Sequence, residues 1–400
     1  MKICNICLSL CLMSLSVILL NSCSKTIDES SLPKIVDAAA SVSVPSIEIK
    51  PEVKVEPKKV RFSATGDNLI HDGIYKQAAA RANNLGYDFI PLYAHMQDFY
   101  KQFDVNWINQ ETLITDEFEP SSYPCFCTPE ALGNAAYDLG FRVFSTSNNH
   151  SYDKGAKGID ATLRYWDKMP NDTINTGFFS EETLLDIPMH EVNGIKIAYL
   201  AYTQHTNGIP VPQSANARVI LTDETEIIKA QIEKANEIAD FVIVGVHWGN
   251  EGSHNITDGQ KQLGQIIADY GADAIIGTHP HVIQPLEFIK SADNRSIPIA
   301  YSLGNFVSAQ SAADNLIGLI CSFDIIENTN GDFEAQNLAA TPIVTHYNKN
   351  FRNISVYLYS DYTDELADIH GVRERMPDFS KNYINKVINN TINPDFIKFE

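Results

Sequence analysis

The stretch from Phe241 to Pro285 places the tightest constraint on how this chain can fold. An apolar run at residues 241–246 ends on His247, and a second at 274–277 ends on Thr278-His279-Pro280-His281. Residues 260–270 between them have the spacing of an amphipathic helix. Two short β-branched runs joined by one helix predict a parallel βαβ unit. The sequence therefore predicts an α/β protein.

Both predicted strands end in histidine. Ligands of open α/β sheets bind outside the carboxyl ends of the strands, so His247, His279 and His281 are expected to meet on one rim. Pro280 fixes its own φ and is expected to push His279 toward an extended conformation. A single histidine at a strand end is more often a hydrogen-bonded structural residue. Three at the ends of two adjacent strands favour a metal site.

Polar residues follow other predicted strands in the same way. Residues 60–65 run into Gly66-Asp67, residues 103–108 end in Asn109-Gln110-Glu111, and residues 141–146 lead to Asn148-Asn149-His150. The plain alternative for Asp67 is that it caps the following helix. His71 comes four residues after Asp67, so on a helical turn its side chain would face the same side as that of Asp67. The polar loop at 115–129 could cover the site.

Further strands are expected toward the C-terminus. Asn193-Gly194 is a signal for a type I′ hairpin turn between residues 190–192 and 195–202. Residues 297–306 read as one strand with a polar end, and residues 318–326 and 354–359 read as strands of a second sheet.

The bulk composition narrows the class of partner. The 400 residues are 44% hydrophobic and 10% aromatic, as in a globular protein with a large core. The formal net charge of −20 repels phosphates and anionic membranes, so no nucleic-acid partner is expected. It also disfavours an anionic substrate unless cations in the site offset the field. Solubility alone is the simpler explanation of the acidity.

The N-terminus predicts a cell-envelope location. Lys2 precedes an apolar core at residues 8–20 that is too short to remain in a bilayer, and the core ends in Leu20-Asn21-Ser22-Cys23. This tetrapeptide resembles the bacterial lipobox, so residues 1–23 are predicted to be a lipoprotein signal peptide and Cys23 the lipid attachment site. An ordinary cleaved signal is the alternative. Ser24 after the cysteine indicates the outer membrane, and the proline-containing residues 24–59 predict a flexible tether.

The cysteines that remain suggest no chemistry. Cys125 and Cys127 lack the spacing of a redox motif or zinc knuckle, and with Cys321 their odd number excludes complete internal pairing. A disulfide from Cys321 to one of the other two stays open in an oxidising compartment.

The candidate site residues share one topological position after predicted strands. Carboxylate, amide and imidazole ligands suit Mn, Zn or Fe and do not suit a soft thiolate metal. Seven candidates exceed what one tetrahedral ion needs, which suggests two ions, and paired ions stabilise both oxygens of an in-line displacement. The candidates are Asp67, Glu111, Asn149, His150, His247, His279 and His281.

Six ordered motifs resemble the CapA family of poly-γ-glutamate capsule synthesis proteins, whose fold is similar to calcineurin-like metallophosphoesterases. The resemblance covers roughly residues 60–310. The expected architecture is a four-layer α/β/β/α sandwich of two mixed sheets with helices outside, formed by a CapA-like domain at 60–345 and a partly helical C-terminal extension at 346–400. The motifs are Gly66-Asp67, Asn109-Gln110-Glu111-Thr112, Asn148-Asn149-His150, His247-Trp248-Gly249, Gly277-Thr278-His279-Pro280-His281 and Tyr301-Ser302-Leu303-Gly304-Asn305-Phe306.

The resemblance implies a role for each residue. Asp67 would bind the first ion, Glu111 would bridge, and His279 and His281 would divide between the two ions. Asn149 and His247 would bind the second ion, while His150 would protonate the leaving group or stabilise developing charge. The chain departs from the related phosphoesterases in two ways: it lacks their Asp-x-His motif, and Glu111 replaces an aspartate. Because of these departures, the number of bound ions, one or two, stays open. His71 and Asn109 are possible additional ligands.

Two functions follow from these expectations. One is a metal-dependent hydrolase or transferase acting on a phosphoester, or on an amide of an envelope polymer. The other is a non-catalytic, lipid-anchored subunit of a capsule assembly that binds an anionic polymer. A structural role for the histidines is the third interpretation.

Overall fold

The computed structural model describes residues 57–399, which lie within one compact unit. The predicted signal peptide, Cys23 and almost all of the predicted tether lie outside the described residues. Within residues 57–399, no helix combines the length and the apolar character needed to cross a membrane.

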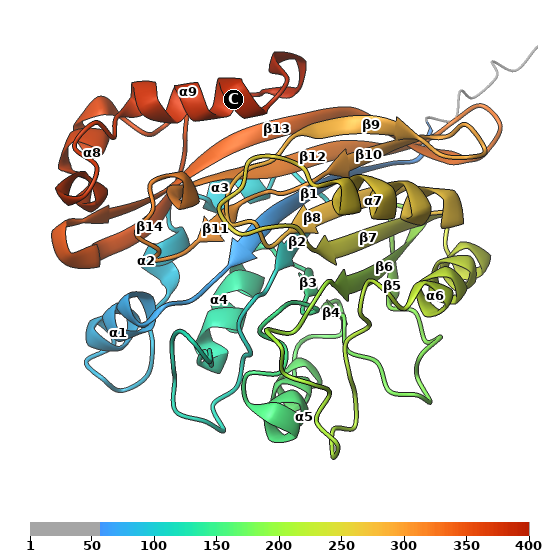
Figure 1. Cartoon of the computed structure of the whole chain (residues 1–400), viewed down its shortest axis with the longest axis horizontal. Coiled ribbons are helices and arrows are strands. Elements are labelled where there is room, and N and C mark those ends of the chain that lie inside the picture. The colour runs from blue at the N-terminus through green and yellow to red at the C-terminus, as the bar shows by residue number, and fades with distance from the viewer. Residues whose placement is uncertain (1–56, 400) are drawn as a thin grey trace, which may run out of the picture. The chain divides into compact units, whose positions relative to one another are not determined.

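Two mixed sheets form the centre of this unit (Figure 1). Eight described strands form the first sheet, in the order β14 (Arg352–Leu358), β13 (Phe333–Asn348), β12 (Ile317–Glu327), β1 (Lys59–Asn68), β2 (Val105–Asn109), β3 (Val143–Ser145) and β4 (Ile174–Thr176), with β11 (Asn305–Val307) also paired to β1. Six form the second, in the order β5 (Met189–Val192), β6 (Ile195–Thr203), β7 (Phe241–His247), β8 (Ala274–Thr278), β10 (Ser296–Ala300) and β9 (Leu286–Lys290).

The predicted βαβ unit is confirmed. β7 pairs with β8 in parallel, and α7 (Asp258–Tyr270) connects them. A capping box starts α7, because Thr257 Oγ1 accepts from Gln260 N and Thr257 N donates to Gln260 Oε1. Gly271, with φ of +119°, ends it. The turn at Asn193-Gly194 is also as predicted, with φ of +52° and +75°.

Helices cover the outer face of each sheet, which confirms the predicted four-layer arrangement. Figure 1 shows α6 (Thr225–Ile238) and α7 beside β6, β7 and β8. Alternate residues of β7 face opposite ways: Phe241 and Ile243 join the core between the sheets, whereas Val242 and Val244 pack in the core beneath α6 and α7. The remaining helices are α1 (Asp72–Arg81), α2 (Ile90–Tyr93), α3 (Gln97–Tyr100), α4 (Glu130–Leu139), α5 (Gly155–Trp166), α8 (Asp364–Ile369) and α9 (Lys381–Thr391).

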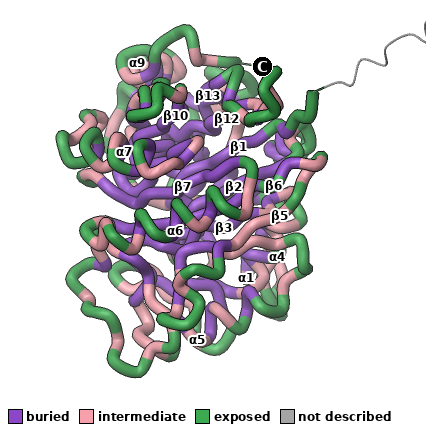
Figure 2. Tube along the Cα trace, turned by 90° about the vertical axis from the view of Figure 1, so that its right-hand side faces the viewer, coloured by how far each residue is buried: buried purple, intermediate pink, exposed green. Residues whose placement is uncertain are grey.

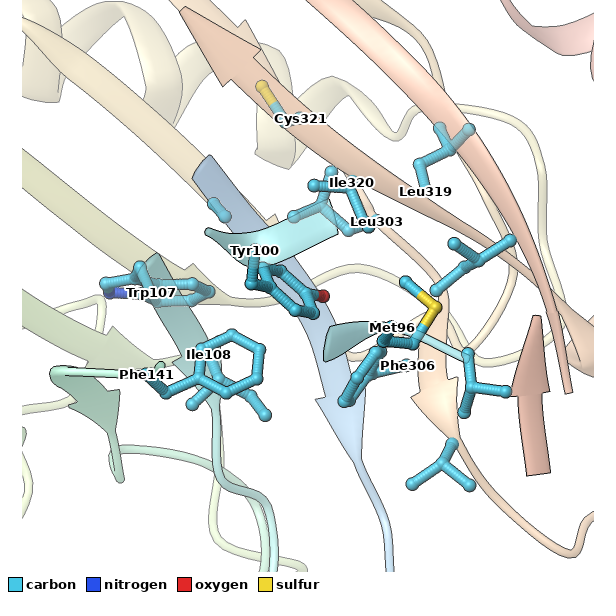
Figure 3. Close-up of a cluster of buried hydrophobic side chains, with 14 of the residues drawn as sticks. Met96, Tyr100, Trp107, Ile108, Phe141, Leu303, Phe306, Leu319, Ile320 and Cys321 are labelled. Carbon is cyan, nitrogen blue, oxygen red and sulfur yellow. The ribbon is translucent and has the colours of Figure 1, made fainter. Parts of the chain in front are cut away.

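Large aromatic side chains fill the core around the first sheet. Figure 3 shows Tyr100, Phe141 and Phe306 gathered there, and the Tyr100 and Phe141 rings lie 4.7 Å apart. In Figure 2 the central strands are buried, while exposed segments lie on the surrounding helices and loops. Full burial of each such side chain stabilises the fold by about 1.5–3 kcal/mol. The strands that carry the candidate site residues at their ends are thus anchored in a packed core.

Two strand predictions need correction. Residues 297–306 are not one strand, because β10 belongs to the second sheet and β11 to the first, and the chain crosses between the sheets at residues 301–304. Strands β12 and β14 do not form a separate sheet, because β12 pairs with β1 and thereby extends the first one. Cys125, Cys127 and Cys321 are free thiols.

Candidate metal centre

Strand ends from both sheets meet at one edge of the fold. In the first sheet, Asp67 of β1 pairs with Asn109 at the end of β2, and β3 lies beside β2. In the second sheet, His247 ends β7 and pairs with Thr278 at the end of β8. The loops that leave these strands carry Glu111, Asn149, His150, His279 and His281.

A close backbone approach sets the position of Asp67. Asp67 N donates to Gly304 O over 2.9 Å, in the segment that crosses between the sheets. A Cβ atom on Gly66 would lie only 1.8 Å from Gly304 O, so only glycine fits before Asp67. Asp67 does not cap the following helix, because the N-cap of α1 is His71.

The site contains two groups of metal-ligand side chains that share one residue. Asp67, Glu111 and His281 form the first-ion group, and Glu111, His247 and His279 form the second-ion group. Within each group the potential ligand atoms lie within 4.8 Å of one another, and all five side chains are buried. These groups can hold metal ions, with Glu111 placed between them.

Contacts within the groups are short. His281 Nδ1 lies 3.0 Å from Asp67 Oδ2, and His279 Nδ1 lies 3.0 Å from His247 Nε2. Glu111 Oε1 lies 3.7 Å from His247 Nε2 and 3.7 Å from His281 Nε2. Asn149 is outside both groups, but its Oδ1 is 3.0 Å from His247 Nε2 and adds an amide oxygen beside the second-ion group.

Glu111 gives the clearest reason to place cations here. Both of its carboxylate oxygens are buried and have no hydrogen-bond partner among the described residues. Leaving a buried ionised carboxylate without a partner costs several kcal/mol, so such groups are normally paired or bound to a metal. A divalent cation in either group would supply the missing partner, and the nitrogen and oxygen donor set fits one.

The conformation of the His279-Pro280-His281 segment differs from the prediction. His279 has φ of +99° and His281 has φ of +59°, so His279 is not extended as expected from the proline that follows it. His279 N donates to Asp67 Oδ2 over 3.3 Å, which helps to hold this backbone. Positive φ is uncommon for residues other than glycine, and strained backbone of this kind tends to cluster at functional sites. Here it directs both imidazoles toward the same edge.

Burial and charge divide the three imidazoles. Burial lowers the pKa of His247 well below its usual range, and burial with the neighbouring His281 lowers the pKa of His279 to about 3. Burial also opposes a charge on His281, but Glu111 and Asp67 outweigh this effect and raise its pKa to about 9. Burial raises the pKa of Glu111. His247 and His279 are therefore neutral at pH 7, as metal ligands must be, whereas His281 would have to release its proton when an ion binds.

Several neighbours orient the candidate ligands. Asn109 Nδ2 donates to Asp67 Oδ1 over 2.7 Å, so Asn109 supports the carboxylate. Thr278 Oγ1 lies 3.0 Å from His247 Nδ1 and leaves Nε2 facing the site. Such supporting contacts fix ring orientation in metal sites. The sequence predicts Asn109 only as a possible additional metal ligand.

His150 belongs to neither group and has its own carboxylate partner. His150 Nδ1 donates to Asp153 Oδ2 over 2.8 Å, and Phe126 N donates to the same oxygen over 2.6 Å. Phe126 lies in the loop at 115–129 and packs edge-on against the rings of His150 and His71. That loop therefore packs against His150 and His71 beside the ligand groups.

His71 stands apart from the ligand groups. Its Nδ1 accepts a hydrogen bond from Ala309 N over 3.3 Å, and burial lowers its pKa to about 4. Its nitrogen atoms belong to neither of the groups found among the described residues.

Sequence reasoning missed Asp153, His205 and Asn207. Asp153 follows His150 by three residues in the same loop, and that spacing was a usable signal. The His205 ring lies 4.9 Å from His279, and Asn207 Oδ1 accepts from Asn149 Nδ2 over 3.3 Å. Asn207-Gly208 is an Asn-Gly pair, a turn signal like the one recognised at residues 193–194.

The fold and the buried ligand groups describe a two-sheet α/β protein with side chains at one edge that could bind metal ions. Residues 61–310 match the family described as "Bacterial capsule synthesis protein PGA_cap", and the chain belongs to this family.

Two curated relatives carry related names. "PGA biosynthesis protein CapA" of Bacillus subtilis (strain 168) is 34% identical over 209 residues, which are 52% of this chain and 52% of that protein. "Capsule biosynthesis protein CapA" of Bacillus anthracis is 29% identical over 267 residues, which are 64% of this chain and 61% of that protein. The matches thus span between half and two thirds of each relative.

Among solved structures, the NAD nucleotidase of Haemophilus influenzae is similar with a TM-score of 0.43 and 13% identity. The match covers 83% of this chain and 67% of that one.

Proposed function

We propose that this protein is a metal-dependent hydrolase of the bacterial cell envelope that acts during the synthesis or export of an anionic capsule polymer, such as poly-γ-glutamate. Its target would be a phosphoester, or an amide of the polymer. The observation that carries the proposal is the pair of buried ligand groups that share the unpartnered carboxylate of Glu111. Membership of the capsule synthesis family and the names of the two relatives support the biological setting.

In this proposal each ligand has a stated position. Asp67 and His281 would hold the first ion, His247, His279 and Asn149 the second, and Glu111 would bridge them. Nitrogen and oxygen ligands together favour Mn, Zn or Fe. When bound, such ions supply Lewis-acid activation of the scissile group and of the attacking water.

His150 would handle the proton of the leaving group. Its Nδ1 is engaged with Asp153, so Nε2 is the atom left to hold and deliver a proton. The Phe126 amide donates to the same Asp153 oxygen and keeps that carboxylate in place. A positioned imidazole contributes about 10²–10⁴-fold to such reactions.

Charge supports the need for cations with an anionic substrate. The chain has a formal net charge of −20, which repels a polyanion at long range. Two divalent ions at the edge would offset the two buried carboxylates there and leave a local attraction for phosphate or carboxylate groups.

We also propose that the protein is anchored by lipid on Cys23, in the outer membrane, with residues 24–59 as a tether. Capsule synthesis partners would then meet it at the cell envelope. Replacing Cys23 with alanine should move the protein from the membrane fraction to the soluble fraction. Retention of the Cys23→Ala protein in the membrane would refute lipid anchoring.

The test of the proposed activity combines elemental analysis with turnover. The protein, purified without added metal, is analysed for bound ions and assayed on a chromogenic phosphodiester and on poly-γ-glutamate. We expect one or two transition-metal ions per chain, with turnover that is lost in His279→Ala. A protein that binds the polymer without cleaving either substrate would favour the non-catalytic capsule subunit instead.

A further inference from the structure

The segment after β6 forms a tight turn at residues 206–209, and residues 205–209 are called the clamp turn. Ile209 N donates to Thr206 O over 2.9 Å, and Asn207 and Gly208 have φ of +53° and +73°. Positive φ at both central residues is the mark of a type I′ turn, which favours Asn-Gly. Thr206 Oγ1 donates to Ile209 O over 2.6 Å and closes the turn further.

The clamp turn is attached to the strand end that carries His247. Gln204 N donates to His247 O over 2.8 Å, and Gln204 Oε1 accepts from Gly249 N over 2.8 Å. Thr203 Oγ1 donates to His205 O over 2.9 Å. The turn is therefore fixed relative to one ligand of the second-ion group.

The side chain of Asn207 contacts one end of the Asn149 amide, and the other end of that amide faces the second-ion group. Asn149 Nδ2 donates to Asn207 Oδ1 over 3.3 Å, while Asn149 Oδ1 lies 3.0 Å from His247 Nε2. A carboxamide has an acceptor at one end and a donor at the other. An acceptor at Asn207 therefore favours the rotation that presents oxygen, and not NH₂, to a cation.

The clamp turn also contacts His279, another ligand of the second-ion group. The His205 ring meets the His279 ring edge-on at 83°, with centroids 4.9 Å apart. Asn207 N donates to His205 Nδ1 over 3.3 Å, which fixes the His205 ring in that position. In contrast, the first-ion ligands Asp67 and His281 contact each other directly, and Asn109 supports Asp67 through a hydrogen bond.

We propose that the clamp turn assembles the second-ion ligands, with Asn207 as a positioning residue that acts through Asn149. The turn thereby sets the affinity for the second ion independently of the first. This inference rests on the proposed function, because it requires that the two groups bind ions.

The experiment titrates Mn²⁺ into the metal-free protein by calorimetry and follows the electron paramagnetic resonance of the spin-coupled pair. Asn207→Gly keeps the positive φ but removes the amide acceptor. Asn207→Asp keeps an acceptor and serves as the conservative rescue. Asn193→Gly is the matched control, because Asn193 has φ of +52° before Gly194 in the hairpin between β5 and β6.

We expect Asn207→Gly to lose about 10–100-fold in affinity for the second ion, as for other residues that support metal ligands. Its first-ion affinity should be unchanged, and its coupled-pair signal should give way to that of an isolated Mn²⁺. Asn207→Asp and Asn193→Gly should retain the coupled pair.

Two results would refute the proposed role of the clamp turn while leaving the proposed function intact. One is wild-type affinity for both ions in Asn207→Gly, and the other is an equal loss in Asn193→Gly. Absence of any Mn²⁺ binding to the wild-type protein would instead refute the proposed function, on which the clamp depends.

Discussion

Two clusters of buried histidines in this protein look alike at first and differ in their hydrogen bonds. At the candidate metal centre, the rings of His247 and His279 are 4.7 Å apart. Near the C-terminus, the rings of His346 and His370 are 4.9 Å apart. All four side chains are buried, and burial lowers the pKa of His279 and that of His370 to about 3. Neither burial nor titration separates the two clusters.

Their partners do separate them. In the C-terminal cluster, each ring nitrogen has a protein partner: His346 contacts Tyr362 Oη and Asn348 Oδ1, while His370 contacts Thr345 O and Val372 N. At the edge, His279 Nδ1 faces another imidazole nitrogen, and Glu111 beside it has no hydrogen-bond partner in the described chain. In a candidate metal site, several acceptor atoms converge and too few N–H or O–H donors are present to pair with them. In a packed core such as the C-terminal cluster, each ring nitrogen has its own partner.

The largest predicted contrast comes from truncating one histidine in each cluster. His279→Ala should reduce affinity for the second ion by about 100-fold or more, since losing only a supporting residue costs 10–100-fold. His346→Ala should leave metal affinity unchanged and destabilise the fold by about 2–4 kcal/mol, through a cavity and an unpartnered tyrosine hydroxyl. Metal titration and urea unfolding of both variants measure the two effects. A similar loss of metal affinity in both variants would show that the two histidine clusters do not differ in metal binding.

Glu111→Gln should have opposite effects on stability and on binding. Burial raises the pKa of Glu111, so ionisation of this group at pH 7 destabilises the folded chain. The variant should be more stable than the wild type by about 1–3 kcal/mol in chelator, yet bind neither ion. Thermal unfolding with chelator and with Mn²⁺ tests both parts. A less stable variant in chelator would show that the carboxylate is already satisfied.

His370 predicts a pH dependence that belongs to the structural cluster. Its folded pKa of about 3 lies below the ordinary value of 6.5, so the unfolded chain binds the proton first. Its stabilising contribution is complete above pH 6.5 and declines as pH falls toward 3, by about 1 kcal/mol between pH 6 and 5. His370→Gln should remove this part of the pH dependence, as measured by urea unfolding in chelator. Parallel profiles for the two proteins would contradict it.

The edge itself could be predicted because it depends on strand ends. The apolar runs before His247 and Thr278 have strong strand patterns, and α7 between them has a capping box and a terminal glycine. Placing ligands at the carboxyl ends of such strands then brings Asp67, Glu111 and the histidines together without knowledge of any loop.

What could not be predicted depends on contacts between distant segments. Gly66 and Gly304 approach through their backbones across 238 residues of sequence, and the chain changes sheets where they meet. The positive φ of His279 overrides the usual preference before proline, because tertiary contacts such as that with Asp67 hold it. Asn207 carried a local turn signal, but the sequence gives no indication that its side chain meets Asn149.

The most direct test of the two-group site is anomalous scattering from crystals grown with Mn²⁺. We predict two manganese peaks that share Glu111, one bounded by Asp67 and His281 and the other by His247 and His279. No peak at saturating Mn²⁺, or peaks only at other residues, would contradict it.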